Sequence, residues 1–401
     1  MQSENVAYQG KVRDRIRRSL LEGSRSLAEV VRGCQGAYPA VVKDLLDGLR
    51  SEIVIRPAPV FELSSELRRS TNESRLAKLE GNPVLASWYF TDETCKRLAQ
   101  LWDWSQRRIA FLGTPRLFEW FATAKIGDRR ALLDLDALVV AALRDLSTPS
   151  DDVIEYDAFT EIPEAFRGQF DCVIFDPPWY PEDYELWLRR ASTLAPSGVF
   201  CFSLFPELTR PDAPTERSAI MRQLATWAES PTVISEYLEY DVPSFERYQL
   251  AAWDIREIGS WKVSDLVICQ MQSTPAGNTL RAPLRQRRVA WTEIDIGLLR
   301  TFLSPSSPDT PSVAFLRCPV EGSPVLPSPS RRDPALRDVN LLTSRGHGLI
   351  CSNPPRLASI LGELRKTQLA GTLTRKHIDR VDIDESSKRL LESIVLGGSN
   401  E

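Results

Sequence analysis

The residues best suited to chemistry lie in one stretch, Phe170–Tyr180, which reads FDCVIFDPPWY. Its first half is a run of β-forming residues that predicts a buried strand, and the two prolines turn the chain out of the sheet where that strand ends. The carboxylate of Asp176 can accept a hydrogen bond from an amine N–H, and the carbonyl of Pro177 can accept a second. An amino group held by both acceptors has its lone pair aimed at an electrophilic carbon.

Two aromatic residues follow the prolines, Trp179 and Tyr180, and their flat faces can stack on a heterocycle or hold a cation. The segment Asp176–Trp179 resembles the D-P-P-Y/W motif of amino-methyltransferases, which methylate exocyclic nitrogens of adenine or cytosine from S-adenosylmethionine. The resemblance implies a catalytic site that consists of Asp176, Pro177, Pro178, Trp179 and Tyr180. The alternative interpretation is a strand that ends in a Pro-Pro turn with a capping Asp.

Strands and helices alternate around this stretch, which predicts a doubly wound, Rossmann-like parallel sheet over residues 88–273. Open sheets of this kind bind ligands at the carboxyl ends of their strands. The expected strands are Arg108–Gly113, Arg130–Asp136, Val153–Asp157, Phe170–Asp176, Gly198–Leu204, Thr232–Tyr240 and Asp265–Met271. The expected helices are Phe90–Leu101, with Thr91 or Asp92 as N-cap, Glu182–Leu194 and Met221–Ala228.

Acidic side chains end the second and third expected strands, in the order that a nucleoside cofactor requires. Gly113 lets the backbone approach the cofactor, and Asp134, about twenty residues later, can bind both ribose hydroxyls, with Asp136 as second choice. Asp157 can accept a hydrogen bond from an adenine amino group. We therefore expect a cofactor of the S-adenosylmethionine type. The predicted cofactor-binding residues are Leu112, Gly113, Thr114, Asp134, Asp136 and Asp157.

The amino-terminal residues 1–56 have the pattern of a winged-helix module. We expect helices at Val12–Leu21, from an N-cap at Ser26, and at Tyr38–Arg50, followed by a strand at Ile53–Ile55. The third helix mixes acidic with basic residues and is poorly suited to phosphate. We therefore expect this module to pack on the catalytic domain or to bind a partner, either a second copy or another protein, in preference to DNA.

The loop after the first sheet strand carries one glycine where the pattern G-x-G-x-x-G would have three. This loop stands in a recognisable order with the winged-helix pattern, a T-x-E-T-like segment at Thr91–Thr94, an L-D-x-D strand and an F-D-x-x-x-x-D-P-P strand. Over residues 10–275 that order resembles branched-chain polyamine synthases. The resemblance implies an aminopropyltransferase that uses decarboxylated S-adenosylmethionine and a polyamine.

Two features of the sequence favour a planar base over a polyamine as acceptor. In the polyamine synthase family the single glycine is followed by acids suited to a polycation, whereas this chain has Thr114–Arg116 there. Trp179 after the prolines also suits a planar ring. Further aromatic residues between Asp241 and Trp261 either wall a base pocket or belong to the core; they are Phe245, Arg247 beside Tyr248, Trp253 and Trp261.

The remaining segments indicate a connector and a carboxyl-terminal extension. Residues 57–87 are a polar connector with an expected helix at Ser65–Leu79. Residues 274–401 begin with a basic arm at Ala276–Arg288, continue through Pro- and Ser-rich loops at Ser304–Ser330, and end in a small α+β appendage. The appendage is expected to include strands at Val313–Arg317 and Gly348–Cys351 and a helix at Pro355–Leu364.

Composition narrows the classes of function. The net charge of -4 gives no overall attraction to nucleic acid or to acidic membranes, and no apolar run is long enough to span a membrane. Seven cysteines without a C-x-x-C pair, together with only two histidines, argue against a metal site and for a reducing, cytoplasmic location.

We therefore expect an S-adenosylmethionine-dependent transferase that N-methylates the exocyclic amine of a nucleobase, free or in a nucleic acid. The second hypothesis is a polyamine aminopropyltransferase on the same scaffold. The third is an inactive methyltransferase fold that serves as a binding or regulatory module.

Overall fold

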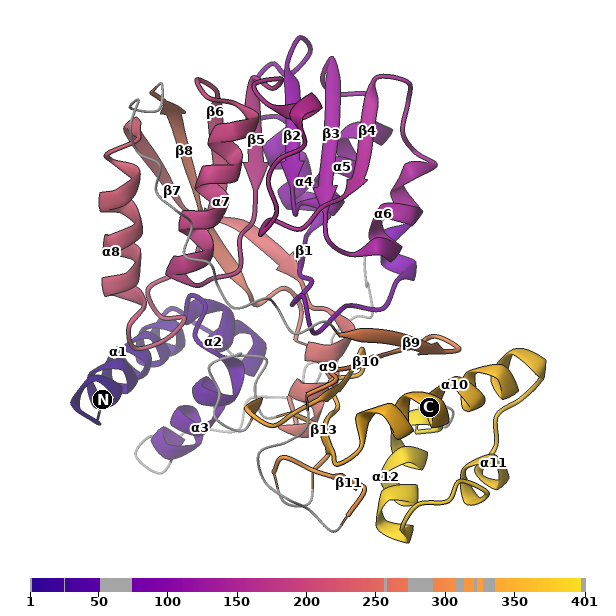
Figure 1. Cartoon of the computed structure of the whole chain (residues 1–401). Helices are drawn as coiled ribbons and strands as arrows, with labels where there is room; N and C mark the ends of the chain where they lie inside the picture. Colours follow the sequence, from indigo (N-terminus) through magenta and orange to yellow (C-terminus); the bar gives the residue numbers. More distant parts are fainter. Residues whose placement is uncertain are drawn as a thin grey trace. The chain divides into compact units, whose positions relative to one another are not determined.

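The computed structural model describes residues 2–24, 26–50, 74–255, 258–272, 291–306, 314–320, 323–326 and 336–397 (Figure 1). The expected strand Ile53–Ile55 and the basic arm Ala276–Arg288 lie outside these ranges, as does most of the expected helix Ser65–Leu79. Contacts divide the chain into two compact units: one is Met1–Leu79, Trp88–Val242 and Glu257–Ala282, and the other is Glu80–Ser87, Pro243–Arg256 and Pro283–Glu401. Within the described ranges, no helix has the length and apolar character needed to cross a membrane.

The first unit is built on an eight-stranded sheet with the order β1-β7-β8-β6-β5-β2-β3-β4. Strands β4, β3, β2, β5 and β6 run parallel, which confirms the predicted doubly wound α/β sheet. The strands are β1 Tyr89–Phe90, β2 Arg108–Leu112, β3 Arg129–Asp134, β4 Asp151–Glu155, β5 Cys172–Phe175, β6 Val199–Leu204, β7 Ala228–Asp241 and β8 Val263–Met271.

The prediction of a wholly parallel sheet was wrong at one edge. Strand β8 is antiparallel to both β6 and β7, and β1 is antiparallel to β7. A parallel connection needs a crossover that packs on the sheet, whereas neighbouring antiparallel strands need none. Most of the segment between β7 and β8, Pro243–Arg256, belongs to the second unit.

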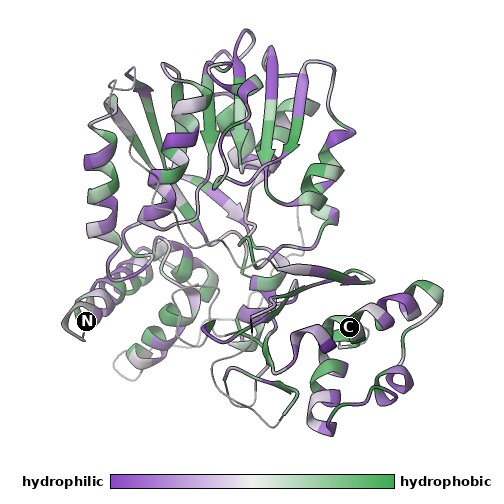
Figure 2. Cartoon of the chain, in the orientation of Figure 1, coloured by the Kyte–Doolittle hydropathy of each residue, from purple (hydrophilic) through white to green (hydrophobic). Residues whose placement is uncertain are grey.

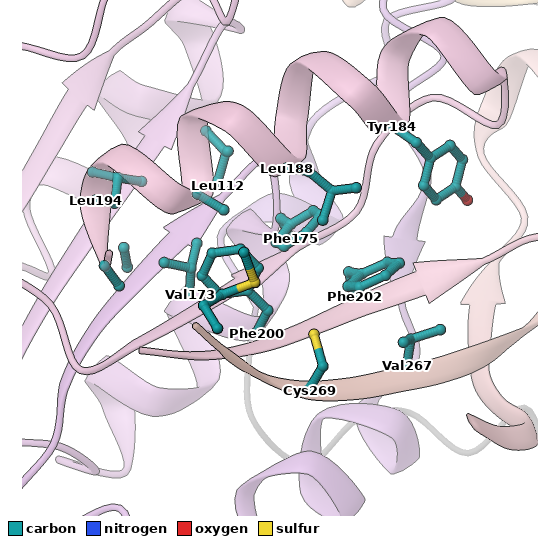
Figure 3. Packing of buried hydrophobic residues seen from close by; sticks show 14 of the residues in the cluster. Leu112, Val173, Phe175, Tyr184, Leu188, Leu194, Phe200, Phe202, Val267 and Cys269 are labelled. Carbon is teal, nitrogen blue, oxygen red and sulfur yellow. The ribbon is translucent and has the colours of Figure 1, made fainter. Parts of the chain in front are cut away.

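The two faces of the sheet are both apolar because successive residues of a strand point to opposite faces. In β5, Val173 and Phe175 join one buried cluster, while Cys172 and Ile174 join the other. Figure 3 shows the first cluster, in which Phe175 stacks on Phe202 at a ring-centroid distance of 4.8 Å. Burial on both faces explains why the strands read as nearly continuous hydrophobic runs.

Helices cover both faces. In Figure 1, α7 lies in front of the sheet, and α4 and α5 lie behind it. The helices are α4 Asp92–Ala99, α5 Pro115–Thr123, α6 Ala137–Arg144, α7 Pro181–Leu194 and α8 Ala213–Leu224. The expected N-cap at Thr91 is confirmed, since its side chain accepts from the Thr94 N–H at 3.2 Å. The expected helix Met221–Ala228 was displaced: α8 ends at Leu224, and Ala228 already begins β7.

Strand register brings the candidate residues to one edge of the sheet. Leu112, the last residue of β2, pairs with Leu133 of β3 on one side and with Phe175 of β5 on the other. Phe175 in turn pairs with Phe202 of β6. The chain leaves β2 toward β3 and β4 and returns to β5 on the opposite side, so β2 and β5 flank the switch point at which open α/β sheets bind ligands.

In the part of the chain that the structure describes, three α-helices precede the sheet: α1 Gln2–Leu21, α2 Leu27–Gly33 and α3 Pro39–Arg50. The predicted cap at Ser26 is present, because its side chain accepts from Glu29 N while the Glu29 carboxylate accepts from Ser26 N. The helices agree with the predicted helical part of the module. The wing lies outside the described residues, so the winged-helix assignment stays a prediction.

The second unit contains a five-stranded antiparallel sheet with the order β11-β13-β12-β10-β9 and three helices that share one apolar core. The unit also includes α9 Ser244–Ala252. Its strands are β9 Thr292–Ile296, β10 Leu299–Leu303, β11 Leu316–Arg317, β12 Leu341–Thr343 and β13 Gly348–Cys351, and its later helices are α10 Pro354–Ala370, α11 Arg375–Asp379 and α12 Glu385–Val395. The expected helix of the appendage is thus longer than the sequence indicated.

Ion pairs join neighbouring strands at the amino-end edge of the sheet, where Figure 2 shows β3 and β4 hydrophilic before they become hydrophobic. Arg130 and Asp151 pair at 2.7 Å with side chains that are 4% and 0% exposed. Arg129 and Asp152 pair at the same distance, but their side chains are 31% and 38% exposed. The two pairs have the same chemistry on the same strands and differ mainly in burial.

This difference predicts unequal effects on stability. Arg130→Ala leaves the buried Asp151 carboxylate without its cation and should lower the free energy of unfolding by about 3–5 kcal/mol. Arg129→Ala, the matched control, should lower it by about 0–1 kcal/mol because water screens its pair. Urea unfolding of both variants measures the two effects, and equal losses would contradict this account of the edge.

Candidate active site

The carboxylate of Asp176 lies at the carboxyl end of β5, surrounded by hydroxyl and indole donors. Its Oδ1 accepts from the Ser203 hydroxyl and, at 3.0 Å, from the Tyr240 hydroxyl. The Trp179 indole also donates to the carboxylate. Burial raises the pKa of Asp176 to about 6, while these donors and the nearby charge of Lys262 act against the rise.

An aromatic box stands beside this carboxylate, made of Trp88, Trp179 and Tyr240. The Trp179 and Tyr240 rings meet edge to face at 5.9 Å, and the Trp88 and Tyr240 rings do so at 6.4 Å. The ammonium of Lys262 lies 4.1 Å from the Trp179 centroid, 4.2 Å from that of Trp88 and 5.3 Å from that of Tyr240. The box therefore holds a cation in the immediate surroundings of Asp176.

The rest of the DPPWY segment forms the entry to α7. Pro177 is buried, and the Pro178 carbonyl accepts from Tyr180 N at 2.7 Å. Tyr180 is the N-cap residue of α7, and the Arg210 guanidinium lies 5.4 Å from its ring centroid. Arg210 also donates to the Trp179 carbonyl at 2.5 Å, which ties the turn to the segment after β6. Of the two prolyl carbonyls, the one at Pro178 is thus already engaged.

The single-glycine loop is fixed between β3 and β5. Gly113, which follows Leu112, has a φ of 62°, donates to the Leu133 carbonyl at 2.9 Å, and has no room for a Cβ because the Trp187 indole of α7 packs against it. Thr114 is buried, and its hydroxyl donates to the Ile174 carbonyl at 3.3 Å. Glycine is therefore required at this position by its positive φ and by the packing of Trp187 against it.

The three acids after β3 and β4 have different surroundings. Asp134 ends β3 and accepts from Asp136 N at 2.9 Å, and its burial raises its pKa to about 7. Asp136 caps α6 by accepting from Leu138 N at 3.1 Å. Asp157 lies just beyond β4 and accepts from Phe159 N at 2.9 Å. Because the Asp136 carboxylate already caps α6, Asp134 is the better candidate for accepting hydrogen bonds from the hydroxyls of a ribose.

Arg116, in the first turn of α5, takes part in the packing of α4 against α5. It pairs with Asp92 and, at 2.5 Å, with Glu119; the side chains of Arg116 and Glu119 are buried, and that of Asp92 is half-buried. Glu119 also accepts from the Ser74 hydroxyl at 2.7 Å. The residue therefore has a structural role that the sequence pattern did not reveal.

Several residues of the site were missed in the sequence. Phe175 pairs with Phe202, so the residues that follow them, Asp176 and Ser203, lie side by side. This neighbourhood can be recognised only once the register of β5 and β6 is known. Trp88 lies just before β1, Tyr240 lies in β7 and Lys262 lies just before β8, at the antiparallel edge that the sequence pattern predicted to be parallel. The aromatic segment before Lys262 is divided: Trp261 packs on Trp88 at 5.8 Å, whereas Phe245, with Arg247, Tyr248 and Trp253, belongs to the second unit.

Comparison with known families gives one match. Residues 82–198 match the family model of probable N6-adenine methyltransferases. The matched segment includes β2 to β5 and the DPPWY turn, and it confirms the resemblance to amino-methyltransferases. No curated protein matches the chain significantly.

Solved structures show where the fold recurs. The branched-chain polyamine synthase from Thermus thermophilus, in complex with N4-aminopropylspermidine and 5'-methylthioadenosine, is 16% identical over 65% of this chain and 87% of its own, with a TM-score of 0.50. Its C9 mutein is 17% identical over 65% and 86%, also at 0.50. A putative RNA methyltransferase from Pyrococcus horikoshii is 14% identical over 49% and 94%, at 0.33. The synthases confirm a Rossmann-like methyltransferase fold, and at these identities the likeness concerns the fold alone.

Asp134 allows a test of the site that needs no ligand. Its pKa is raised from 3.8 to about 7, so its proton stabilises the folded chain and this contribution is lost as pH rises from about 4 through 7. Asp134→Asn keeps an acceptor for Asp136 N and cannot ionise. The variant should match the parent near pH 4 and exceed its melting temperature at pH 8. Melting curves at the two pH values measure this difference. A variant that is less stable than the parent at pH 8 would contradict a raised pKa of Asp134 in the folded chain.

Proposed function

We propose that this chain is an S-adenosylmethionine-dependent methyltransferase that N-methylates the exocyclic amine of a nucleobase. The observation that carries the proposal is the arrangement at the carboxyl end of β5, where the Asp176 carboxylate, the buried Pro177 and the Trp179 indole stand together. The match of residues 82–198 to probable N6-adenine methyltransferases supports the same reaction class. Within the reaction, Asp176 and the Pro177 carbonyl accept the two hydrogen bonds of an amino group, and Trp179 stacks on its ring.

The acids after β3 and β4 suit the cofactor of that family by their chemistry. Asp134 can accept hydrogen bonds from ribose hydroxyls, and Asp157 can accept one from an adenine amine. S-adenosylmethionine supplies an electrophilic methyl carbon when it is bound. The chain need only aim the amine and shield it, because the proton on nitrogen is lost after the attack and no histidine base is required. Asp176 works in its ionised form, whose acceptor strength is greater than that of the protonated acid.

Aminopropyl transfer to a polyamine is the second candidate. The likeness to the Thermus thermophilus polyamine synthase supports it at the level of the fold. Clustered indole and phenol faces like those of the aromatic box bind alkylammonium groups, but in this chain Lys262 already supplies a cation there. The two candidates differ in the charge of the acceptor, which is neutral for a nucleobase amine and positive for a polyamine.

Cofactor binding separates these candidates from an inactive binding module. The chain should bind S-adenosylmethionine in isothermal titration calorimetry, and Asp134→Ala should weaken that binding because ribose hydroxyls lose their acceptor. A preference for decarboxylated S-adenosylmethionine would support aminopropyl transfer instead. The absence of heat with either compound and with S-adenosylhomocysteine would contradict both enzymatic functions.

The role of Asp176 has its own test. Asp176→Ala should leave cofactor affinity unchanged and slow methyl transfer to an adenine-containing oligonucleotide by about a hundred- to a thousandfold, as the loss of a hydrogen bond that strengthens in the transition state does. Trp179→Ala should mainly raise KM, since stacking of one base contributes about 1–3 kcal/mol. Turnover and melting temperature are measured on both variants. An Asp176→Ala protein that is destabilised but fully active would reduce this segment to a structural turn.

A further inference from the structure

The aromatic box already contains a cation that belongs to the chain. Lys262 places its ammonium 4.1 Å from the Trp179 ring centroid and 4.2 Å from that of Trp88, distances at which a cation is bound by the ring faces. Two indoles and a phenol around one nitrogen form the kind of site that recognises alkylammonium ligands. Here that site lies beside the carboxylate proposed to hold the acceptor amine.

We propose that Lys262 is a specificity-determining residue, whose ammonium fills the aromatic box and so excludes the ammonium group of a polyamine while leaving Asp176 to an uncharged, planar amine. The inference rests on the proposed function, because it assigns a substrate class to the same site. It chooses between the two acceptor classes on the basis of charge.

The backbone explains why Lys262 reaches this position. Strand β8 runs antiparallel to β6, so the residue just before β8 lies at the carboxyl-end edge of the sheet, where Asp176 also lies. The Lys262 carbonyl accepts from Tyr240 N at 3.1 Å, which fixes the lysine backbone to the strand that carries the third ring of the box. The side chain is half-buried. Its place in the box is therefore set by the pairing of β7 and β8.

Charge gives the second step of the argument. A polyamine nitrogen that entered the box would meet the Lys262 ammonium at close range, and like charges at such distances repel strongly where water is partly excluded. The Lys262 charge also acts on Asp176 and lowers the pKa of its carboxyl, which weakens the attraction of that carboxylate for a polycation. A neutral exocyclic amine brings no charge toward Lys262 and needs only hydrogen-bond acceptors, so this repulsion does not act on it.

Emptying the box should create a binding site for a polyamine. Spermidine, titrated by calorimetry, should show no binding to the parent chain at millimolar concentration. Its Kd for Lys262→Ala should lie at least about tenfold below the millimolar concentration at which the parent shows no binding. A desolvated cation–π contact provides a gain in affinity of this size. Lys262→Arg, the matched control, keeps a cation in the box and should behave like the parent. Lys262→Gln, which is uncharged and shorter, provides a second variant in which a gain is expected.

Two further results decide the matter. Adding Trp88→Ala to Lys262→Ala should remove the gain, because the new ligand would lose a ring of the box. Spermidine binding by the parent chain, accompanied by quenching of tryptophan fluorescence, would overturn the inference, and so would the absence of a gain in both folded variants. Spermidine binding is measured without methyl transfer. A failure to methylate an adenine oligonucleotide would therefore contradict the proposed function, but it would not by itself change the spermidine results.

Discussion

A carboxylate withdrawn from water must be compensated, and this requirement organises the site around Asp176. An ionised acid in an apolar corner of a sheet is costly unless donors or a cation replace its hydration. Here the replacement comes from three side chains that donate and from one ammonium, and they derive from β6, β7, the DPPWY turn and the residue before β8. The pKa of Asp176 at about 6 shows that compensation is incomplete. A carboxylate in that condition benefits from a further donor, which is what an acceptor amine provides.

The fold supplies this arrangement through register more than through loops. Gly113, Asp176 and Ser203 each follow a strand residue that pairs with its neighbour across β2, β5 and β6. A slip of one residue in any of these strands would invert its faces and move the functional side chain away from the edge. The apolar clusters on both faces oppose such a slip, because Phe175 and Phe202 would leave the core in which they stack. The positions of the polar side chains therefore depend on hydrophobic packing.

The sequence predicted the parallel part of the sheet well because its strands are short, continuous apolar runs that end in glycine, acid or proline. Those endings also identified Gly113, Asp134 and Asp176 as residues of one edge. Prediction from the sequence failed for features that depend on contacts between residues distant in the chain. Strands β7 and β8 pair antiparallel, and only this three-dimensional pairing shows that Lys262 and Tyr240 lie together at the carboxyl-end edge. Similarly, no pattern distinguishes Asp136 as a helix cap from Asp134 as a strand-end acid until the hydrogen bonds of α6 are known.

The DPPWY turn, which we propose binds an amine, lies beside an occupied cation site, and this bears on how two chemistries share one scaffold. Both reactions need an electrophilic carbon on sulfur and an aimed nitrogen, and the DPPWY turn provides the second for either. The two reactions differ in what must surround the nitrogen. A polyamine is positively charged and needs a cation-binding site, whereas a nucleobase needs a flat side chain on which its ring can stack. Trp179 serves both needs, since one indole face can stack on a base or bind a cation. Because the Lys262 ammonium lies against that indole, it opposes the binding of a second cation there. A second basic residue, Arg116, uses its charge in a different place, in ion pairs between α4 and α5. Under the proposed function, such a site changes its substrate class through charge alone, while the strands, the turn and the acids after β3 and β4 stay the same.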